Sequence, residues 1–370
     1  MHRLLRKVRQ ALLADLHLGA ASLAARLGTP HDAIEWASIN PGFASVAPLA
    51  RLDAYVVDGV PKFLELNAES PAGMGYASAI AGVVGADAAW AVAGLSGSFD
   101  DPVPSVIRTV RAVAREYGVQ SGFSVGIVDF GGVATAPEFA LLAAAFREAG
   151  HRCDVLDPQD LRFNGAHLAG PNGNIDVVFR RLVIRDLRAN LEKCHALMQA
   201  YRQHRVCMVN SLRTALLHNK AVFALLHDPD FPLSHTERRF VSRHIPETRL
   251  LDARWHDQVG NDRQNWVCKP IDSHGGQGVV LGWTTTEAGW QAALSRPGKY
   301  IVQRRVSAPI GEFLDARDGQ VHARVVDIGP FLAQGKYAGF LCRLAEGELA
   351  NVSAGGASQV PVFTCRQASG

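Results

Sequence analysis

The feature that most constrains the fold is a run of short apolar strands alternating with helices between residues 105 and 210. The strand-like runs are rich in Val and Ile, and Pro104 and Gly118 bound the first predicted helix. Continuous apolar strands separated by helices indicate a parallel sheet covered on both faces. We therefore predict a Rossmann-like unit over 105–210, with strands at 123–130, 153–157, 175–181 and 206–210 and helices at 105–118, 137–149 and 186–203.

The segments on either side of this unit follow a different pattern. LDAYVVDGVPKFLELN (52–67) predicts a hairpin, because two apolar strands flank Asp58-Gly59. From 211 onward, strand-like pieces, helices and glycine-rich turns indicate an α+β unit of two lobes. Residues before 100 show no fold of their own and need a partner elsewhere in the chain. The fold class is therefore mixed α/β and α+β, divided into 1–104, 105–210 and 211–370.

Composition excludes some functions. The formal net charge of +3 over 370 residues gives no reason to invoke nucleic acid or an acidic membrane. No apolar run reaches the roughly 20 residues of a membrane span. The six cysteines lack C-x-x-C spacing, which is typical of reduced thiols in a cytoplasmic protein. We expect a cytoplasmic protein, and its oligomeric state is left open.

A glycine-rich segment, WVCKPIDSHGGQGVVLG, carries the first candidate site. An apolar strand ends on Lys269, and a loop containing Ser273, Gly275, Gly276 and Gly278 returns directly into another strand. Successive glycines allow backbone N–H groups to converge on an anion, and a lysine at the strand end can reach the same anion. A phosphate-covering loop and a plain glycine-rich hairpin fit this segment about equally well.

The predicted hairpin carries the second candidate site. Asp53 lies on its first strand, while Glu65 and Asn67 are two residues apart on the second and so share a face. Hard oxygen ligands of this kind suit Mg²⁺, which is held by carboxylates together with substrate phosphates. The alternative is a set of solvent-facing polar residues on an edge hairpin, and we favour the metal site.

Other polar residues are less specific when each is taken alone. Lys220 precedes a predicted helix, and YIVQRRV (300–306) is an apolar strand whose edge could offer backbone groups to an adenine, with Glu312 nearby to accept from a ribose. Arginines inside apolar strands need anionic partners, so Arg324 and Arg343 indicate either an anion site or structural ion pairs. Arg180 and Arg181 end a strand of the Rossmann-like unit, where they could bind a substrate carboxylate or form a structural ion pair.

Taken in order, these segments resemble the ATP-grasp superfamily. Asn219-Lys220 resembles the Asp-Lys pair that opens its nucleotide-binding region, and VCKP…GGQGV resembles its phosphate-covering strand–loop–strand. VQRRV, with Gln303, Arg304 and Val306, resembles its adenine-contacting hinge, and Glu312 then takes the ribose role. Arg324, Arg343 and Asn351 resemble the residues that hold the triphosphate in its carboxylate–amine ligases.

One element of that superfamily is expected after these strands: an aspartate followed by a strand that ends E-x-N and supplies the Mg²⁺ sites. The sequence ends at Gly370 before such an element, yet Asp53 and FLELNAESPAG (63–73) have its pattern. This order resembles the circularly permuted ATP-grasp proteins, similar to the synthetase part of glutathionylspermidine synthase. The resemblance implies that residues near 53–73 and residues 211–356 form one active site.

The family implies a Mg²⁺- and ATP-dependent ligase that joins a small carboxylate to an amine through an acyl phosphate. Lys220 and Lys269 would hold the α- and β-phosphates, and Arg324 and Arg343 would stabilise the transferred phosphoryl group. The tripeptide and polyamine substrates of glutathionylspermidine synthase are not carried over, because no amidase domain is recognisable. An ATP-grasp phosphotransferase and a catalytically silent ATP-binding scaffold remain as alternatives.

Overall fold

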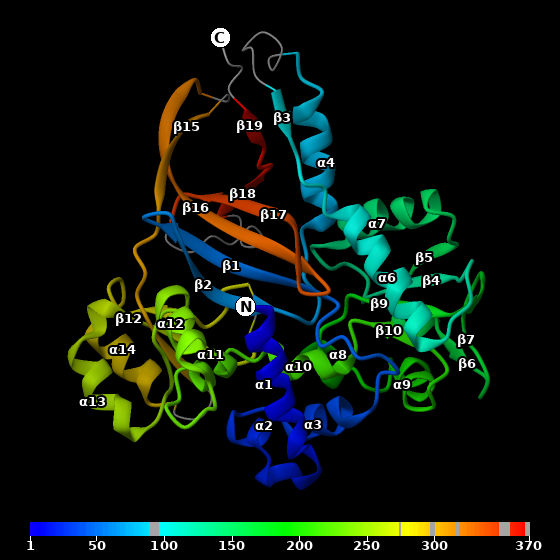
Figure 1. Cartoon of the computed structure of the whole chain (residues 1–370), viewed down its shortest axis with the longest axis horizontal. Helices are drawn as coiled ribbons and strands as arrows, with labels where there is room; N and C mark the ends of the chain where they lie inside the picture. The colour runs from blue at the N-terminus through cyan, green and yellow to red at the C-terminus, as the bar shows by residue number, and fades with distance from the viewer. Residues whose placement is uncertain (89–95, 274, 297–299, 316–317, 348–355, 367–370) are drawn as a thin grey trace.

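A computed structural model describes the chain except for residues 89–95, 274, 297–299, 316–317, 348–355 and 367–370. Three groups of elements surround a central sheet (Figure 1). Short helices from the N-terminus lie on one side, a parallel sheet with its helices lies on a second, and a small antiparallel sheet with helices lies on a third. None of the helices within the described part of the chain is long and apolar enough to span a bilayer.

The central sheet joins the two ends of the chain. Its strand order is β18-β17-β16-β1-β2, and β15 also pairs with β16. The predicted hairpin is present as β1 (Leu49–Val57) and β2 (Val60–Asn67), and its turn residues Asp58 and Gly59 both take positive φ, as tight hairpin turns require. β1 pairs antiparallel with β16, with Ala54 opposite Ile328. The other strands are β15 (Ile310–Asp315), β16 (Gln320–Ala333), β17 (Lys336–Ala345) and β18 (Ala357–Val360).

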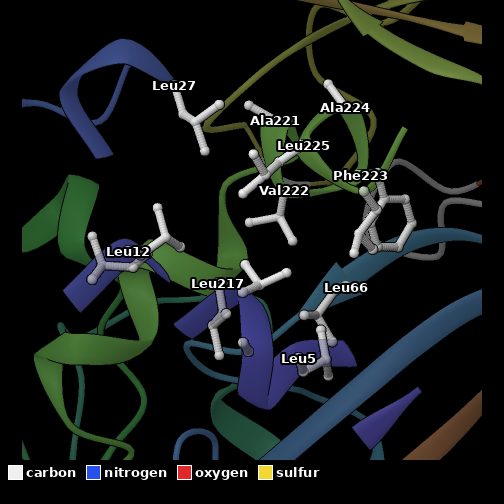
Figure 2. Packing of buried hydrophobic residues seen from close by; sticks show 14 of the residues in the cluster. Leu5, Leu12, Leu27, Leu66, Leu217, Ala221, Val222, Phe223, Ala224 and Leu225 are labelled. Atoms are coloured by element: carbon white, nitrogen blue, oxygen red, sulfur yellow. The ribbon is translucent and has the colours of Figure 1, made fainter. Parts of the chain in front are cut away.

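The N-terminal helices cover one face of this hairpin. Helix α1 (His2–Ala14) buries Leu4, Leu5, Val8 and Leu12 along one stripe, which is the spacing of an amphipathic helix. These residues pack with Leu52 and Leu66 of the hairpin and with α11 in one apolar cluster (Figure 2). Because side chains alternate along a strand, the residues that flank Leu52 and Leu66 point to the opposite face. The neighbouring short helices are η1 (Leu16–Ala21), α2 (Leu23–Arg26) and α3 (His31–Ser38).

The predicted parallel sheet is present, with strand order β10-β9-β4-β5. Val125, Ile127 and Phe179 pack in one cluster with α6 and α7, whereas Val128 and Val178 pack in another with α9. Helices therefore cover both faces, as the continuous apolar strands predict. The elements are β4 (Val125–Val128), β5 (Cys153–Leu156), β9 (Val177–Arg180), β10 (Cys207–Val209), α6 (Val103–Tyr117), α7 (Ala136–Glu148), α8 (Ile184–Ala189) and α9 (His195–Arg202).

One helix prediction in this unit is wrong. The single helix expected over 186–203 is divided into α8 and α9, and Asn190 ends the first of them. The Asn190 side chain donates to the Asp186 carbonyl oxygen, and such local bonds compete with the helical pattern. A small three-stranded sheet of β6 (Arg162–Phe163), β7 (Leu168–Gly170) and β8 (Gly173–Ile175) lies at the edge of the unit, beside η2 (Pro158–Asp160).

The third group is an antiparallel sheet with strand order β11-β14-β12-β13. Its strands are β11 (Thr248–Leu250), β12 (Trp266–Pro270), β13 (Val280–Leu281) and β14 (Tyr300–Arg304). The associated helices are η3 (Leu212–Thr214), α10 (Ala215–His218), α11 (Ala221–Leu226), α12 (His235–His244), α13 (Ala253–Asn261), η4 (Arg263–Asn265) and α14 (Glu287–Leu294). Helix α4 (Met74–Gly85) and the pair β3 (Ser96–Ser98) and β19 (Thr364–Arg366) complete the described elements.

Candidate functional site

The polar residues of the hairpin share one face of the central sheet. Asp53 lies opposite Glu65, and Arg51 lies opposite Asn67. Directly opposed residues of an antiparallel pair project to the same side. This side is opposite to Leu52 and Leu66, which pack against the N-terminal helices. The period-2 pattern of the hairpin therefore places a polar surface back to back with an apolar core.

Two arginines hold Asp53 from both sides. Arg51 Nε lies 2.8 Å from Asp53 Oδ1, and Arg343 Nη2 of β17 lies 3.0 Å from Asp53 Oδ2. Burial alone would raise the pKa of Asp53, but the Arg343 and Arg51 guanidinium groups together hold it below its usual range. Asp53 is therefore an anion at neutral pH, as a carboxylate ligand of a metal must be.

A further carboxylate belongs to this cluster and was not predicted from the sequence. Asp327 of β16 is buried and lies opposite Arg343, whose Nη2 is 2.6 Å from Asp327 Oδ1. Burial raises the pKa of Asp327 to about 6, against the lowering effect of Arg343, and the Asp53 charge raises it further. The available signal was an aspartate inside the apolar run of HARVVD (322–327). Arg51, likewise missed, stood two residues before Asp53 on the same face.

The donor set of the cluster fits a hard divalent cation. Asp53, Glu65 and Asn67 offer carboxylate and amide groups on one face, and Mg²⁺ takes oxygen ligands of this kind. Asn67 Nδ2 is buried and has no hydrogen-bond partner, which is uncommon for a buried amide. Because the two ends of an amide are assigned from their bonds, this group is free to present oxygen to a ligand.

Two lysines face this cluster from the antiparallel sheet and its helices. Lys220 Nζ lies 3.6 Å from Glu65 Oε2 and donates to the Ser273 carbonyl oxygen. Lys269 Nζ donates to Gln303 Oε1 at 2.7 Å. Burial lowers the pKa of Lys269 to about 8, partly offset by the Glu65 carboxylate, and the Lys220 charge lowers it further. The hairpin and residues 220–303 therefore meet at one charged surface.

The glycine-rich loop adjoins Lys220. Its flanking strands β12 and β13 pair with Val267 opposite Leu281, which is the predicted strand–loop–strand. Gly275, Gly276 and Gly278 all take positive φ, and a Cβ on Gly278 would lie 2.7 Å from Pro270 Cγ. Glycine is required here by conformation and by the close approach. Within the loop, Gln277 Oε1 accepts from Arg185 Nη1 at 3.4 Å.

The expected free strand edge at Gln303 is not found. β14 is an inner strand, because Gln303 lies opposite Thr248 on one side and Val267 on the other. The buried Gln303 side chain instead accepts from Lys269 and donates to Thr248 Oγ1 at 3.0 Å. β14 ends at Arg304, whose side chain turns away to Asp262, and Val306 follows outside the strand.

Three other predicted residues do not join the cluster in the described structure. Arg324 lies three positions before Asp327 on β16, so its side chain projects from the opposite face. There it pairs with the exposed Glu346 at 3.1 Å. Glu312 of β15 lies opposite Ala323 on the cluster's face but is exposed, further along the β15–β16 arm. Asn351 falls outside the described residues.

The proposed substrate role of Arg180 and Arg181 is not supported by the structure. The Arg180 side chain is fully buried and donates to the carbonyl oxygens of Asn210, Leu182 and Ser211. Arg181 Nη1 donates to the Pro71 carbonyl oxygen at 2.8 Å, and its Nη2 lies 3.5 Å from the buried Glu138. Burial lowers the pKa of both groups.

These two arginines instead fix the turn that follows Asn67. Glu69 Oε2 accepts from the Ile184 backbone N–H at 2.7 Å and lies 3.7 Å from Arg180. Glu138 Oε1 accepts from the Gly73 and Gly75 backbone N–H groups at 2.8 and 3.0 Å. The parallel sheet thus holds the turn at 68–75, and through it the end of the strand that carries Glu65 and Asn67.

Comparisons with known proteins give structural matches only. No family model and no curated protein matches the sequence. A glutathione synthetase-like effector from Globodera pallida matches with a TM-score of 0.56 and 12% identity, over 98% of this chain and 80% of that one. A putative gamma-glutamylcysteine synthetase from Methylobacillus flagellatus matches with a TM-score of 0.51 and 9% identity, over 97% and 87%.

Weaker matches cover part of the chain. One is a RimK domain ATP-grasp protein from Sphaerobacter thermophilus, with a TM-score of 0.33 and 15% identity, over 65% of this chain and 91% of that one. The fold is mixed α/β and is similar over nearly the whole chain to the two synthetase-like structures. At these identities the likeness concerns the fold alone.

Proposed function

We propose that the protein is an ATP-dependent carboxylate–amine ligase that acts through an acyl phosphate. The observation that carries this proposal is the single charged surface made by Asp53, Glu65 and Arg343 of the central sheet with Lys220 and Lys269 of the other lobe. Cationic side chains beside a glycine-rich loop suit the phosphates of a nucleoside triphosphate, and the carboxylates suit its metal ion. The synthetases among the structural neighbours support the same reaction class.

We assign Mg²⁺ to Asp53, Glu65 and Asn67, where the ion would neutralise phosphate charge and act as a Lewis acid. Lys220 and Lys269 would bind the phosphates as preplaced charges. Ser273, Gly275, Gly276 and Gly278 would form the loop that covers them and excludes water. Because β14 is paired on both sides at Gln303 and the Arg304 backbone N–H donates to the Glu247 carbonyl oxygen, we assign the nucleoside to the segment that follows this strand, at Val306, with Glu312.

Arg343 has a further proposed role at the transferred phosphoryl group. Its guanidinium donates to both Asp53 and Asp327. It can exchange one carboxylate for a phosphoryl group, which also accepts charge-assisted hydrogen bonds from arginine. Asp327 would keep the arginine oriented during that exchange. Asn351 retains its proposed ATP-binding role from the resemblance, whereas Arg324 loses its catalytic assignment because it points to the other face.

We also propose that the fold is a circularly permuted ATP-grasp fold with a Rossmann-like unit before the nucleotide lobes. The hairpin that carries Asp53, Glu65 and Asn67 precedes the strands beside which it lies, since β1 pairs with β16. In the unpermuted order the same element would follow those strands. This supports the assignment of residues 1–104 and 211–370 to one catalytic unit.

The second candidate function is an ATP-grasp phosphotransferase, because an enzyme with the same charged surface could transfer a phosphoryl group without joining an amine. The test is ADP release in the presence of Mg²⁺-ATP and pairs of amino acids, dipeptides and polyamines. A ligase requires a carboxylate and an amine together, and hydroxylamine in place of the amine traps the acyl phosphate as a hydroxamate. ADP release that depends on one substrate and never gives a hydroxamate would contradict ligation.

A further inference from the structure

A small cavity of about 40 Å³ lies beside the charged surface. Its walls come from segments far apart in the chain: Thr29–Ala33, the start of α8, the end of α10 and Asp272. Pro30, Ala33 and Ile184 make part of it apolar. The volume exceeds that of one water, which needs roughly 10–15 Å³ by the same measure, so it has room for a small head group on a short apolar stem.

The polar groups of this cavity differ in whether they already have partners. Arg188 lies 2.6 Å from Asp32, Arg185 lies 3.7 Å from Asp186, and Glu69 accepts from the Ile184 backbone. Among the described residues, by contrast, the Asp272 carboxylate has no hydrogen bond or ion pair. Asp272 is exposed, so the lining presents, at its solvent side, one carboxylate that is free to pair with a cation.

His218 provides a second unused group in the lining. Its Nδ1 lies 3.2 Å from the Leu66 carbonyl oxygen. A carbonyl only accepts, so Nδ1 carries the proton and Nε2 holds a lone pair. Burial lowers the pKa of His218, which keeps the ring neutral, and no partner of Nε2 occurs within the described part of the chain. Both unused groups are therefore hydrogen-bond acceptors, which suit a donor such as an ammonium group.

The position of His218 ties this cavity to the reaction centre. Leu66, which it contacts, lies between Glu65 and Asn67, and Lys220 follows two residues after His218. A ligand bound at Nε2 would therefore approach the proposed phosphoryl-transfer site from the end of β2. We propose that this cavity binds the amine substrate, a primary amine on a short apolar stem, with Asp272 as its counter-ion and His218 Nε2 as acceptor.

This inference rests on the proposed ligase function. The bound ammonium group gives one proton to solvent before it attacks. In the attack the C–N bond forms, the C–O bond to phosphate breaks, and a second N–H proton leaves with the hydrogen phosphate product. We assign Asp272 and His218 to binding the amine and orienting its nitrogen toward the acyl carbon. Holding two reactants in the correct orientation removes a large part of the activation free energy of a bimolecular step.

The first test measures binding without turnover. The side-chain nitrogen resonances of ¹⁵N-labelled protein are recorded with n-propylamine and, as a neutral control, n-propanol; His218→Phe assigns the His218 signal. The Nε2 resonance should shift with the amine and not with the alcohol, and the shift should be lost in Asp272→Asn. An unshifted resonance, or the same shift in Asp272→Asn, would overturn the assignment.

The second test separates the cavity from the ligase function. Asp272→Asn should raise the KM for the amine about tenfold or more, because a hydrogen bond to a charged partner is lost, with a smaller change in the KM for ATP. Hydroxamate formation should fall far less, since hydroxylamine is small and uncharged. Asp318→Asn, on the distant β15–β16 turn, is the matched control.

The outcomes of these tests distinguish the two proposals. If amine use and hydroxamate formation fall equally in Asp272→Asn, while thermal melting shows a folded protein, the cavity does not bind the amine. If the unaltered protein forms no hydroxamate with any carboxylate, the ligase proposal fails, and the resonance experiment still decides whether the cavity binds an amine.

Discussion

Two pairs of arginines in this protein look alike in the sequence and differ in the structure. Arg180 ends a strand of the parallel sheet and Arg181 follows it, whereas Arg51 and Arg343 lie within strands of the central sheet. Both pairs are largely buried and both meet carboxylates. The first pair, however, donates mainly to backbone carbonyl oxygens, whereas the second donates mainly to the side chains of Asp53 and Asp327.

The difference indicates which arginines can take part in chemistry. A guanidinium that satisfies fixed carbonyl oxygens cannot leave them without orphaning buried acceptors, which costs free energy. A guanidinium shared between two carboxylates can exchange one of them for a phosphate at little cost. Arg180 and Arg181 therefore stabilise the turn at 68–75, and Arg343 is available to a ligand.

The largest expected effect is on stability. Arg180→Ala leaves Glu69 buried without its cation and several carbonyl oxygens without donors, so we expect a loss of about 3–5 kcal/mol in the free energy of unfolding. Urea denaturation followed by circular dichroism measures it. A variant that stays fully stable and loses only affinity for a carboxylate substrate would return Arg180 to a binding role and break the comparison.

The next largest effect is on turnover. Glu65→Gln keeps the size of the side chain and removes a charged oxygen ligand beside Lys220. We expect Mg²⁺-dependent ATP consumption to fall roughly 10²–10³-fold, the scale of losing one charge-stabilising group, with unfolding little changed. Glu148→Gln, an exposed glutamate at the end of α7 and outside the proposed site, is the matched control. Unaltered ATP consumption in Glu65→Gln would show that the metal assignment is wrong.

A pH dependence follows from Lys269. Its pKa is lowered to about 8 by burial, so the free protein loses this positive charge as the pH rises through 8. Phosphates bind the charged form, and the KM for ATP should therefore rise by up to about tenfold per pH unit above that point. Lys269→Arg stays charged and should flatten the profile. Equal slopes in the two proteins would remove Lys269 from the phosphate site.

The smallest effect is expected at Arg324. Its partner Glu346 is exposed, and such ion pairs contribute about 0–1 kcal/mol. Arg324→Ala should leave ATP consumption within about twofold, whereas Arg343→Ala should abolish most of it. If ATP consumption falls equally in the two variants, Arg324 and Arg343 do not lie on opposite faces of the sheet, and the strand register described above would be contradicted.

Sequence reasoning found what is local and missed what depends on register. The hairpin and its Asp53, Glu65 and Asn67 follow from period-2 alternation around Asp58-Gly59. Asp327 was missed because its role depends on lying opposite Arg343, which only the pairing of β16 with β17 determines.

The Arg180 and Arg181 positions show the same limit. The sequence shows that a strand ends at these arginines. It does not show that Arg181 donates to the carbonyl oxygen of Pro71, 110 positions earlier in the chain. The break between α8 and α9 was missed because the apolar pattern there continues across Asn190. Distant contacts, and a local bond that competes with the helix, account for these differences.

The central claim is that the N-terminal hairpin and the C-terminal half share one nucleotide site. A crystal structure with Mg²⁺ and a non-hydrolysable ATP analogue tests it most directly. The account predicts the ion at about 2.0–2.1 Å from oxygens of Asp53 and Glu65, with the phosphates between Lys220, Lys269 and Arg343. A nucleotide bound away from the hairpin, or the ion at the group of Asp315, Asp318 and His322, would contradict it.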